Sequence, residues 1–387
     1  MSVSVHVAGV GSTKFGVLPG QSLQSLAVEA ARAALADSCV PPSKIGFLLV
    51  GNFVGGIMTG QELLGPIVAA DLGLSNVAAV KVEAACASSS AAVHIGYNFI
   101  RSGALDAVLV VGVERLTGGP REALTSAMTA AIDQDREGGS GLTFPGFWGL
   151  VMARHMQIYG TTREQVAAVT VKNRAFGVKN PLAQFRKPVT VDEVIASPLI
   201  ADPIRRFDCC PGTDGAAAVV LASEALVRQC GSPSVRIAAS VLLSGPARIV
   251  DYSEITEHDG TVEAARRAYE LAGIGPREIG VAELHDCFSI AEIVDSEDLG
   301  FYPKGEGGAA LLGDASTRNS KVTINPSGGL ISKGHPTGAT GCGQIFEMAL
   351  QMRGVHPSQV EGAQFGLTHN GGGTAAAVTV HILESRI

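Results

Sequence analysis

The chain has 387 residues, of which 46% are apolar and 17% are charged, and its formal net charge is −7. This length predicts two or three units with substantial buried cores, and the composition excludes a disordered chain. Positive charge is not clustered as binding to a phosphate backbone requires, which argues against nucleic acid. No apolar run reaches the roughly 20 residues that span a bilayer, so we expect no membrane association.

The seven cysteines are scattered, without the dense spacing of a disulfide scaffold. The N-terminal segment lacks the basic and apolar regions of a signal peptide. We therefore expect a soluble, unprocessed, cytoplasmic protein. The adjacent pair Cys209 and Cys210 is interpreted as structural, because neighbouring side chains rarely bind one tetrahedral metal together. No metal site is expected.

Apolar runs rich in β-branched residues alternate with helical patterns along the chain, which predicts α/β layers. Residues 214–221 indicate a buried strand, although a helix of period 3.6 also fits them. A polar, Gly- and Pro-rich stretch with one amphipathic helix, near residues 149–175, interrupts the alternation. The predicted strands are 4–9, 46–50 and 107–113, and the predicted helices that alternate with them are 23–36 and 88–101.

The two halves of the chain repeat one plan. Each half has a helix that leads through a proline turn into a strand. In the first half the helix is 27–36 and the strand is 47–50, and in the second half the helix is 262–272 and the strand is 281–284. Each also has a later strand, a turn of small residues, a helix and another strand. The first such turn contains Cys86 and the second contains His335, so the two residues occupy equivalent turns.

This repeat suggests a division of the chain. The predicted N-terminal half comprises residues 1–118 and 201–248, with an inserted loop domain over 119–200. Residues 249–387 form the predicted C-terminal half.

Cys86 lies in the small-residue run Ala85-Cys86-Ala87-Ser88-Ser89-Ser90, directly before a predicted helix. A helix N-terminus and a nearby histidine both stabilise a thiolate, and small neighbours let a bulky thioester approach. The alternative is a buried structural cysteine, which is common.

His335 lies in a loop, residues 325–341, where five glycines surround one histidine. Glycines let the backbone approach a ligand closely, and the imidazole can then act as a base there. The alternative is a surface turn whose histidine only caps the next helix.

Together these motifs resemble the thiolase family. The Cys86 turn resembles its acyl-accepting loop, and residues 334–341, GHPTGATG, resemble its Gly-His-Pro motif. The resemblance covers nearly the whole chain, including 214–218. It implies the thiolase fold: two related α/β halves in a five-layered αβαβα arrangement with an inserted loop domain. It also implies a homodimer or a dimer of dimers.

Two departures indicate a subfamily. Residues 285–288 read His-Asp-Cys-Phe where most thiolases have Asn-Glu-Ala-Phe, and residues 369–373 read His-Asn-Gly-Gly-Gly where most have a Cys-x-Gly motif. Both changes are typical of sterol-carrier-protein-type thiolases and their bacterial and archaeal relatives. In that subfamily the cysteine of His-Asp-Cys-Phe replaces the missing acid/base.

The resemblance implies a role for each motif. Cys86 would be the acylated nucleophile, His335 its base, Cys287 the second acid/base, and His285 a ligand of the thioester oxygen. Alternatively, Cys287 is simply buried and Asp286 satisfies His285. The N–H groups near Cys86 and Gly372 would form an oxyanion hole. His369 and Asn370 would line the site, although His369 could instead be a ligand or a base. Ser327 and Gly328 would bind CoA.

CoA is expected as a substrate, because no fingerprint of a tightly bound cofactor occurs. The basic residues Arg174, Lys179, Arg186 and Lys187 could contact its phosphates, although solvated surface charge is their simpler role. The aromatic segment 144–148 could shape a pocket for a branched, aromatic or steroid-like acyl chain, or could anchor the loop domain.

The expected activity is an acyl-CoA C-acyltransferase that forms or breaks a carbon–carbon bond through acyl-Cys86. Two alternatives remain open within the resemblance. One is a thiolase-like retro-aldolase or lipid-transfer protein that forms no acyl-enzyme. The other is a binding subunit that depends on a small zinc-containing OB-fold partner.

Overall fold

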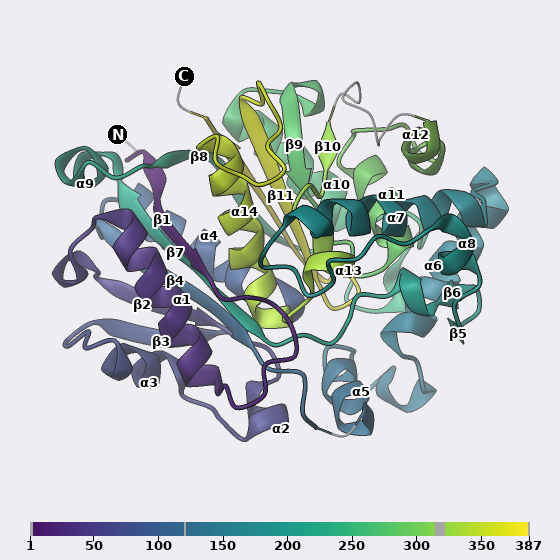
Figure 1. The fold of residues 1–387 in the computed structure, drawn as a ribbon, viewed down its shortest axis with the longest axis horizontal. Helices are drawn as coiled ribbons and strands as arrows, with labels where there is room; N and C mark the ends of the chain where they lie inside the picture. The colour runs from purple at the N-terminus through teal and green to yellow at the C-terminus, as the bar shows by residue number, and fades with distance from the viewer. Residues whose placement is uncertain (1–2, 120, 314–321, 386–387) are drawn as a thin grey trace.

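The computed structural model describes residues 3–119, 121–313 and 322–385 (Figure 1). The strands of the first half are β1 (Val5–Ser12), β2 (Phe47–Gly51), β3 (Ala78–Val82), β4 (Ala107–Glu114) and β7 (Gly215–Ser223). Those of the second half are β8 (Val235–Ser244), β9 (Ile279–Glu283), β10 (Thr323–Ile324), β11 (Phe365–Gly372) and β12 (Ala377–Glu384).

Both halves have the same strand order, which confirms the internal repeat. The first half runs β3-β2-β4-β7-β1 and the second runs β10-β9-β11-β12-β8. When the strands are counted along each half, both orders read third, second, fourth, fifth, first. The halves join edge to edge through β1 and β8, where His6 pairs with Arg236 and Val7 with Val235.

Strands β4 and β7 form the centre of the first half, and both are buried along their whole length. They pair antiparallel from Ala107 opposite Ala222 to Glu114 opposite Gly215. A strand covered on both faces needs a continuous apolar run, and residues 215–223 provide one. This stretch is therefore a strand, and the alternative helix is excluded.

The structure has five layers: the strands of each half are covered by helices on their outer face, and a layer of helices lies between the two halves (Figure 1). This arrangement confirms the predicted fold. Helices α1 (Leu23–Ser38) and α3 (Leu64–Asp71) cover the outer face of the first half, and α10 (Asp259–Ala272) covers that of the second. Helices α4 (Ser88–Arg101) and α14 (Thr340–Met352) pack against each other between the halves. The remaining helices outside residues 119–200 are α2 (Gly55–Thr59), α9 (Glu224–Cys230), α11 (Ser289–Asp298), α12 (Gly307–Gly313) and α13 (Gly329–Lys333).

The stretch 119–200 is mainly helical. The single helix expected near 149–175 is wrong, because two helices lie there. Gly160, at φ 73°, ends the first helix, and a capping box from Thr162 to Gln165 starts the second. The helices of this stretch are α5 (Arg121–Thr129), α6 (Phe144–Tyr159), α7 (Arg163–Lys179) and α8 (Val191–Ile195).

A small hairpin crosses the domain boundary proposed at residue 200. Strand β5 (Leu199–Ala201) pairs antiparallel with β6 (Ile204–Arg205). Helix α7 packs on α11, α12 and α13, so the stretch rests on the second half. The division into an inserted domain and two halves stays our proposal. Within the described ranges, no helix is both long enough and apolar enough to cross a membrane.

Candidate active site

Cys86 lies where strand β3 leads into helix α4. It is the middle residue of a 3-10 turn, Ala85–Ala87, which runs directly into α4. Ala85 has φ 48°, a left-handed conformation that few residues other than glycine adopt. Cys86 is 7% exposed. The predicted position of Cys86 at a helix N-terminus is therefore confirmed. The turn that holds it is buried, and its backbone is strained at Ala85.

His335 lies in the equivalent turn before helix α14. Its N–H donates to Thr213 Oγ1 at 3.0 Å, and its Nδ1 lies 2.7 Å from Thr340 Oγ1. The Thr340 hydroxyl donates to the Pro336 carbonyl, so it accepts from Nδ1, which must carry the proton. The Nε2 lone pair of His335 is therefore free to act as a base.

The N-termini of α4 and α14 touch, and this contact brings the two turns together. The Ser89 hydroxyl accepts from the Cys342 N–H at 3.0 Å. At Gly341, a Cβ atom would come within 2.3 Å of the Ser90 nitrogen, so only glycine fits. Two turns far apart in sequence thus meet at one point.

Three potential catalytic side chains converge at this point. The Cys86 sulfur and one nitrogen each of His285 and His335 all lie within 4.8 Å of one another. The two imidazole rings are 5.0 Å apart and nearly perpendicular, at 81°. Each histidine is 5% exposed. The structure therefore brings one thiol and two imidazoles into one enclosed site.

Burial determines the charge state of these groups. It raises the pKa of Cys86 to about 12, assisted by the negative charge of Glu114. It lowers the pKa of His285 to about 3 and that of His335 well below its ordinary value. We expected the helix N-terminus to stabilise a thiolate, but the loss of hydration outweighs that effect. At neutral pH the site holds a thiol and neutral imidazoles.

Residues 285–288 follow strand β9. Asp286 accepts hydrogen bonds from the Leu330 N–H and from Asn173 Nδ2, both at 2.7 Å. Among the described residues, no hydrogen bond joins Asp286 to His285, so the alternative that Asp286 satisfies His285 is not observed. Asp286 instead ties the His285 loop to helix α13. Cys287 is 9% exposed, and burial raises its pKa well above 9.

Glu114, at the end of β4, ties the His335 turn to the first half. Its carboxylate accepts from the side chain of Asn52 and the N–H of Phe53 on one side. On the other side it accepts from the Thr337 hydroxyl and the Gly338 N–H of the His335 loop. Nothing in the sequence pattern around Glu114 indicated this role.

The end of strand β11 closes the site from the second half. A Cβ on Gly372 would lie 2.2 Å from the Ala84 carbonyl oxygen, so β11 packs tightly against the Cys86 turn. The backbone groups of Cys86 itself and of Gly373 lower the pKa of the thiol, against the larger opposite effect of burial. The glycine run therefore lies beside the Cys86 turn, and the predicted oxyanion role of Gly372 stays a prediction.

Comparisons with known proteins agree with this geometry. Residues 3–225 match the model of the thiolase N-terminal domain, and residues 242–385 match the thiolase C-terminal domain-like model. The chain belongs to the thiolase family. It is therefore an acyltransferase enzyme, as the relatives named acetyl-CoA acetyltransferase also support.

Two relatives and one solved structure illustrate the thiolase match. Acetyl-CoA acetyltransferase of Methanothermobacter thermautotrophicus is 42% identical over 381 residues, which are 98% of this chain and 99% of that protein. Sterol carrier protein 2 of Oryctolagus cuniculus is 39% identical over 395 residues, 97% of this chain and 71% of that protein. The solved Ltp2-ChsH2(DUF35) aldolase has a TM-score of 0.85 at 25% identity, with 99% and 98% coverage.

His369 and Asn370 of this thiolase lie on strand β11, on opposite faces. His369 Nδ1 is 3.4 Å from Asp295, and its Nε2 is 3.2 Å from the Thr261 hydroxyl. Asn370 donates to Gln344 Oε1, whereas its own Oδ1 has no hydrogen-bond partner. Two residues after His369, a Cβ on Gly371 would point to within 3.9 Å of His285. His369 therefore shares a face of β11 with the position that borders His285.

Cys210 is a residue whose position the sequence did not reveal. Its N–H donates to the Cys287 carbonyl at 3.0 Å, and Cys209 bridges to Phe288. Burial and then the charges of Cys209 and Cys86 raise its pKa. The pair does have the expected structural role, because it positions the Cys287 loop, but Cys210 also borders the thiolase site.

The residues predicted to bind CoA are less accessible than expected. Ser327 and Gly328 are both buried, and the Ser327 hydroxyl donates to Glu283 at 2.6 Å. Arg174 is also buried and lies over the ring of Phe185 at 4.0 Å. The other three basic candidates, Lys179, Arg186 and Lys187, are exposed. A CoA site formed by these residues stays a prediction.

The aromatic segment 144–148 begins helix α6. Phe147 and Trp148 are buried, and Trp148 stacks on Phe288 with ring centroids 6.0 Å apart. Phe288 follows Cys287 directly, and all four residues belong to one apolar cluster. The segment thus anchors α6, and it also packs behind the loop of Cys287.

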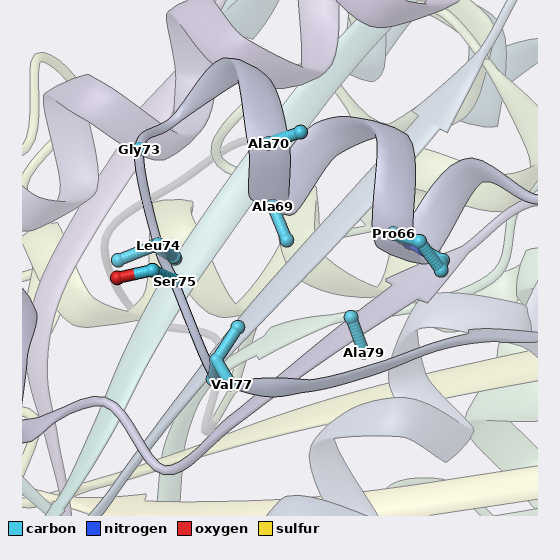
Figure 2. A pocket seen from close by; sticks show the side chains of 8 residues that line it. All are labelled: Pro66, Ala69, Ala70, Gly73, Leu74, Ser75, Val77 and Ala79. Atoms are coloured by element: carbon cyan, nitrogen blue, oxygen red, sulfur yellow. The ribbon is translucent and has the colours of Figure 1, made fainter.

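A surface cavity of about 530 Å³ lies away from the catalytic groups, between α3 and strand β3 (Figure 2). It is lined by Pro66, Ala69, Ala70, Gly73, Leu74, Ser75, Val77 and Ala79. Apart from the Ser75 hydroxyl, none of these residues carries a polar side chain. We assign this cavity no part in thiolase chemistry.

Proposed function

We propose that the protein is an acyl-CoA C-acyltransferase that cleaves a 3-oxoacyl-CoA with CoA, or catalyses the reverse condensation, through an acyl-Cys86 intermediate. The observation that carries this proposal is the convergence of Cys86, His285 and His335 within 4.8 Å in a buried site. CoA and its thioesters enter this scheme as substrates, and we propose no tightly bound cofactor.

The first step begins from neutral groups. His335 Nε2 takes the Cys86 proton while the sulfur attacks the carbonyl carbon, so the thiolate need not exist beforehand. The carbon–carbon bond of the 3-oxoacyl group then breaks, which leaves acyl-Cys86 and the carbanion of the shorter acyl-CoA. Free CoA later attacks acyl-Cys86 and regenerates the thiol.

Two further groups complete the proposed cycle. Cys287 delivers the proton to the carbanion and is protonated again by the thiol of the incoming CoA, while His335 returns its proton to the Cys86 sulfur as the acyl group leaves. His285 donates a hydrogen bond to the thioester oxygen. The N–H groups near Cys86 and Gly372 hold the oxyanion on the acyl group. Each such donor is worth roughly 2.7–4 kcal/mol of barrier.

The acyl group is proposed to be branched, aromatic or otherwise bulky. Support comes from the aromatic cluster of Phe147, Trp148 and Phe288 behind Cys287. A thiolysis screen over short, long and aryl 3-oxoacyl-CoA substrates tests this point. Preference for the short linear substrate would contradict it.

The acyl-enzyme itself is the decisive test. Incubation with acetyl-CoA or a 3-oxoacyl-CoA should add the acyl mass to the intact protein and to the peptide that contains Cys86. The matched control is Cys86→Ala, which should stay unmodified. Turnover by a protein whose Cys86 is never acylated would overturn the proposal.

A retro-aldolase is the second candidate, and the similarity to the Ltp2-ChsH2(DUF35) aldolase structure favours it. The placement of Cys86 beside His335 favours the acyltransferase instead. The two differ in stoichiometry, because an aldolase does not consume CoA. Cleavage that proceeds without free CoA would therefore identify the aldolase.

We also propose a homodimer or a dimer of dimers, and a small zinc-containing OB-fold partner. The aldolase structure, whose name includes a DUF35 protein, supports the search for a partner. Co-purification and activity with and without that partner test it. The third candidate, a binding subunit, predicts no turnover without the partner.

Seven free cysteines support a reducing, cytoplasmic location.

A further inference from the structure

Three side chains of the site could together bind a metal ion, although the proposed reaction needs no metal. A cysteine sulfur and two imidazole nitrogens, from Cys86, His285 and His335, all lie within 4.8 Å of one another. Thiolate and imidazole are the ligands that Zn²⁺ prefers, and three protein ligands with one open position is an established zinc geometry. We propose that these three residues form an inhibitory site for Zn²⁺.

The distances fit a zinc ion after a small adjustment. Zinc binds sulfur at about 2.3 Å and nitrogen at about 2.0–2.1 Å, so tetrahedral ligand atoms lie roughly 3.3–3.6 Å apart. Ligand atoms that are at most 4.8 Å apart need to converge by no more than about 1.5 Å. Rotation of the three side chains about their own bonds can supply such a change, without movement of the β-sheet.

Two further features of the site support a metal ligand role. The His335 Nδ1–H is held by Thr340 Oγ1 at 2.7 Å, which leaves Nε2 as the ligand atom. His285 Nδ1 is buried and has no hydrogen-bond partner. A buried polar atom without a partner costs free energy, and a zinc ion bound at Nδ1 would supply the missing partner.

Binding and acylation exclude each other. Zinc binding forms one Zn–S and two Zn–N bonds, displaces water from the ion and releases the Cys86 thiol proton to solvent. The sulfur lone pair that would attack a thioester is then occupied, and so is the Nε2 that would accept the proton. Zinc therefore blocks the first step reversibly, and a chelator such as EDTA should restore activity.

Cobalt absorption tests the site without any turnover, so its outcome is independent of the proposed acyl transfer. Titration of the full-length protein with Co²⁺ should give one equivalent of bound metal, intense visible bands of tetrahedral cobalt and a sulfur-to-cobalt charge-transfer band. Zn²⁺ should displace the cobalt and bleach both. Weak octahedral bands, or no binding, would overturn the proposal.

Variants locate the site. Cys86→Ala should remove the charge-transfer band, and Thr340→Ala should weaken Zn²⁺ binding by roughly 10–100-fold, as loss of an outer-shell partner does. Cys230→Ser, on helix α9, is the control and should bind as the original chain does. An unchanged charge-transfer band in Cys86→Ala would place the metal elsewhere and overturn the proposal.

Protection from alkylation tests the same point without a substitution. One equivalent of Zn²⁺ should slow modification of Cys86 by iodoacetamide at least tenfold, measured on the Cys86 peptide, and EDTA should abolish the protection. The exposed Cys39 serves as the internal control for reagent activity. Equal rates at Cys86 with and without Zn²⁺ would also overturn the proposal.

Discussion

The Cys86 thiol and its two neighbouring imidazoles are uncharged at neutral pH because all three are buried. A helix N-terminus and two backbone groups favour the thiolate, yet the thiol pKa still rises to about 12. The low pKa of His335 keeps its Nε2 unprotonated and able to accept the thiol proton. In the proposed reaction, His335 therefore acts as a positioned base and takes the thiol proton only as the bond to substrate forms.

This charge state predicts how Cys86 reacts as the pH changes. Below the thiol pKa, the thiolate fraction rises tenfold per pH unit, so alkylation by iodoacetamide should accelerate by about tenfold per unit from pH 7 to 9. Quantitative mass spectrometry of the Cys86 peptide measures the rate. A pair of thiolate and imidazolium would instead give a rate that is already constant near neutral pH.

The division of roles between the two cysteines predicts separate effects of their removal. Cys287→Ala should lower turnover by about 10²–10⁴-fold, the usual contribution of an acid/base, while Cys86 is still acylated by acetyl-CoA. Cys86→Ala should abolish both acylation and turnover. Steady-state rates and intact-protein mass measure the two quantities. Full turnover by Cys287→Ala would show that Cys287 is only a buried apolar residue.

At the scale of elements, the site depends on how two helices cross. Helices α4 and α14 occupy equivalent places in the two halves, and each begins directly after a turn, which holds Cys86 in one half and His335 in the other. The crossing requires close backbone contact, which Gly341 permits and the bond from the Cys342 N–H to Ser89 fixes. Because the helices meet at their N-termini, the two turns meet as well.

Gly341→Ala should therefore affect both stability and chemistry. The added Cβ would lie 2.3 Å from the Ser90 backbone, and relief of this overlap should cost roughly 1–3 kcal/mol of unfolding free energy. The helices would separate at the site, so acylation of Cys86 should slow. Chemical denaturation and acylation rates measure these effects. Gly139→Ala, with open space around it, is the control and should change neither.

At the scale of the whole molecule, the two halves share one core. A buried cluster joins residues of both, including Val219 and Leu49 of the first half and Ile345 and Met348 of the second. Strands β1 and β8 add only a short edge contact. The central helices, packed between the sheets, therefore contribute most of the contact that holds the halves together.

Met348→Ala tests this shared core. Loss of the buried side chain should lower the unfolding free energy by about 2–5 kcal/mol. Hydrogen exchange should show that α1 and α10, on opposite outer faces, lose protection together. Val262→Ala, at an exposed position on α10, should change stability by less than about 0.5 kcal/mol. Loss of protection in α10 alone would show that the halves unfold independently.

The sequence by itself determined the repeat, the α/β layers and the two motif turns, because each depends on local pattern and spacing. Helix 88–101 and strand 107–113 were predicted almost to the residue. The buried strand β7 was ambiguous, because a continuous apolar run suits a covered strand and a buried helix equally. Only its pairing with β1 and β4 resolved it.

Tertiary structure alone decided what surrounds Cys86. Glu114 and Cys210 come from two segments that share no spacing with the Cys86 motif, so no local pattern could group the three residues. The same applies to the charge state: a helix N-terminus is visible in sequence and favours a thiolate, but dehydration depends on every segment that closes the site. Local interactions fixed where Cys86 lies, and long-range packing decided that its side chain is a neutral thiol beside a neutral imidazole.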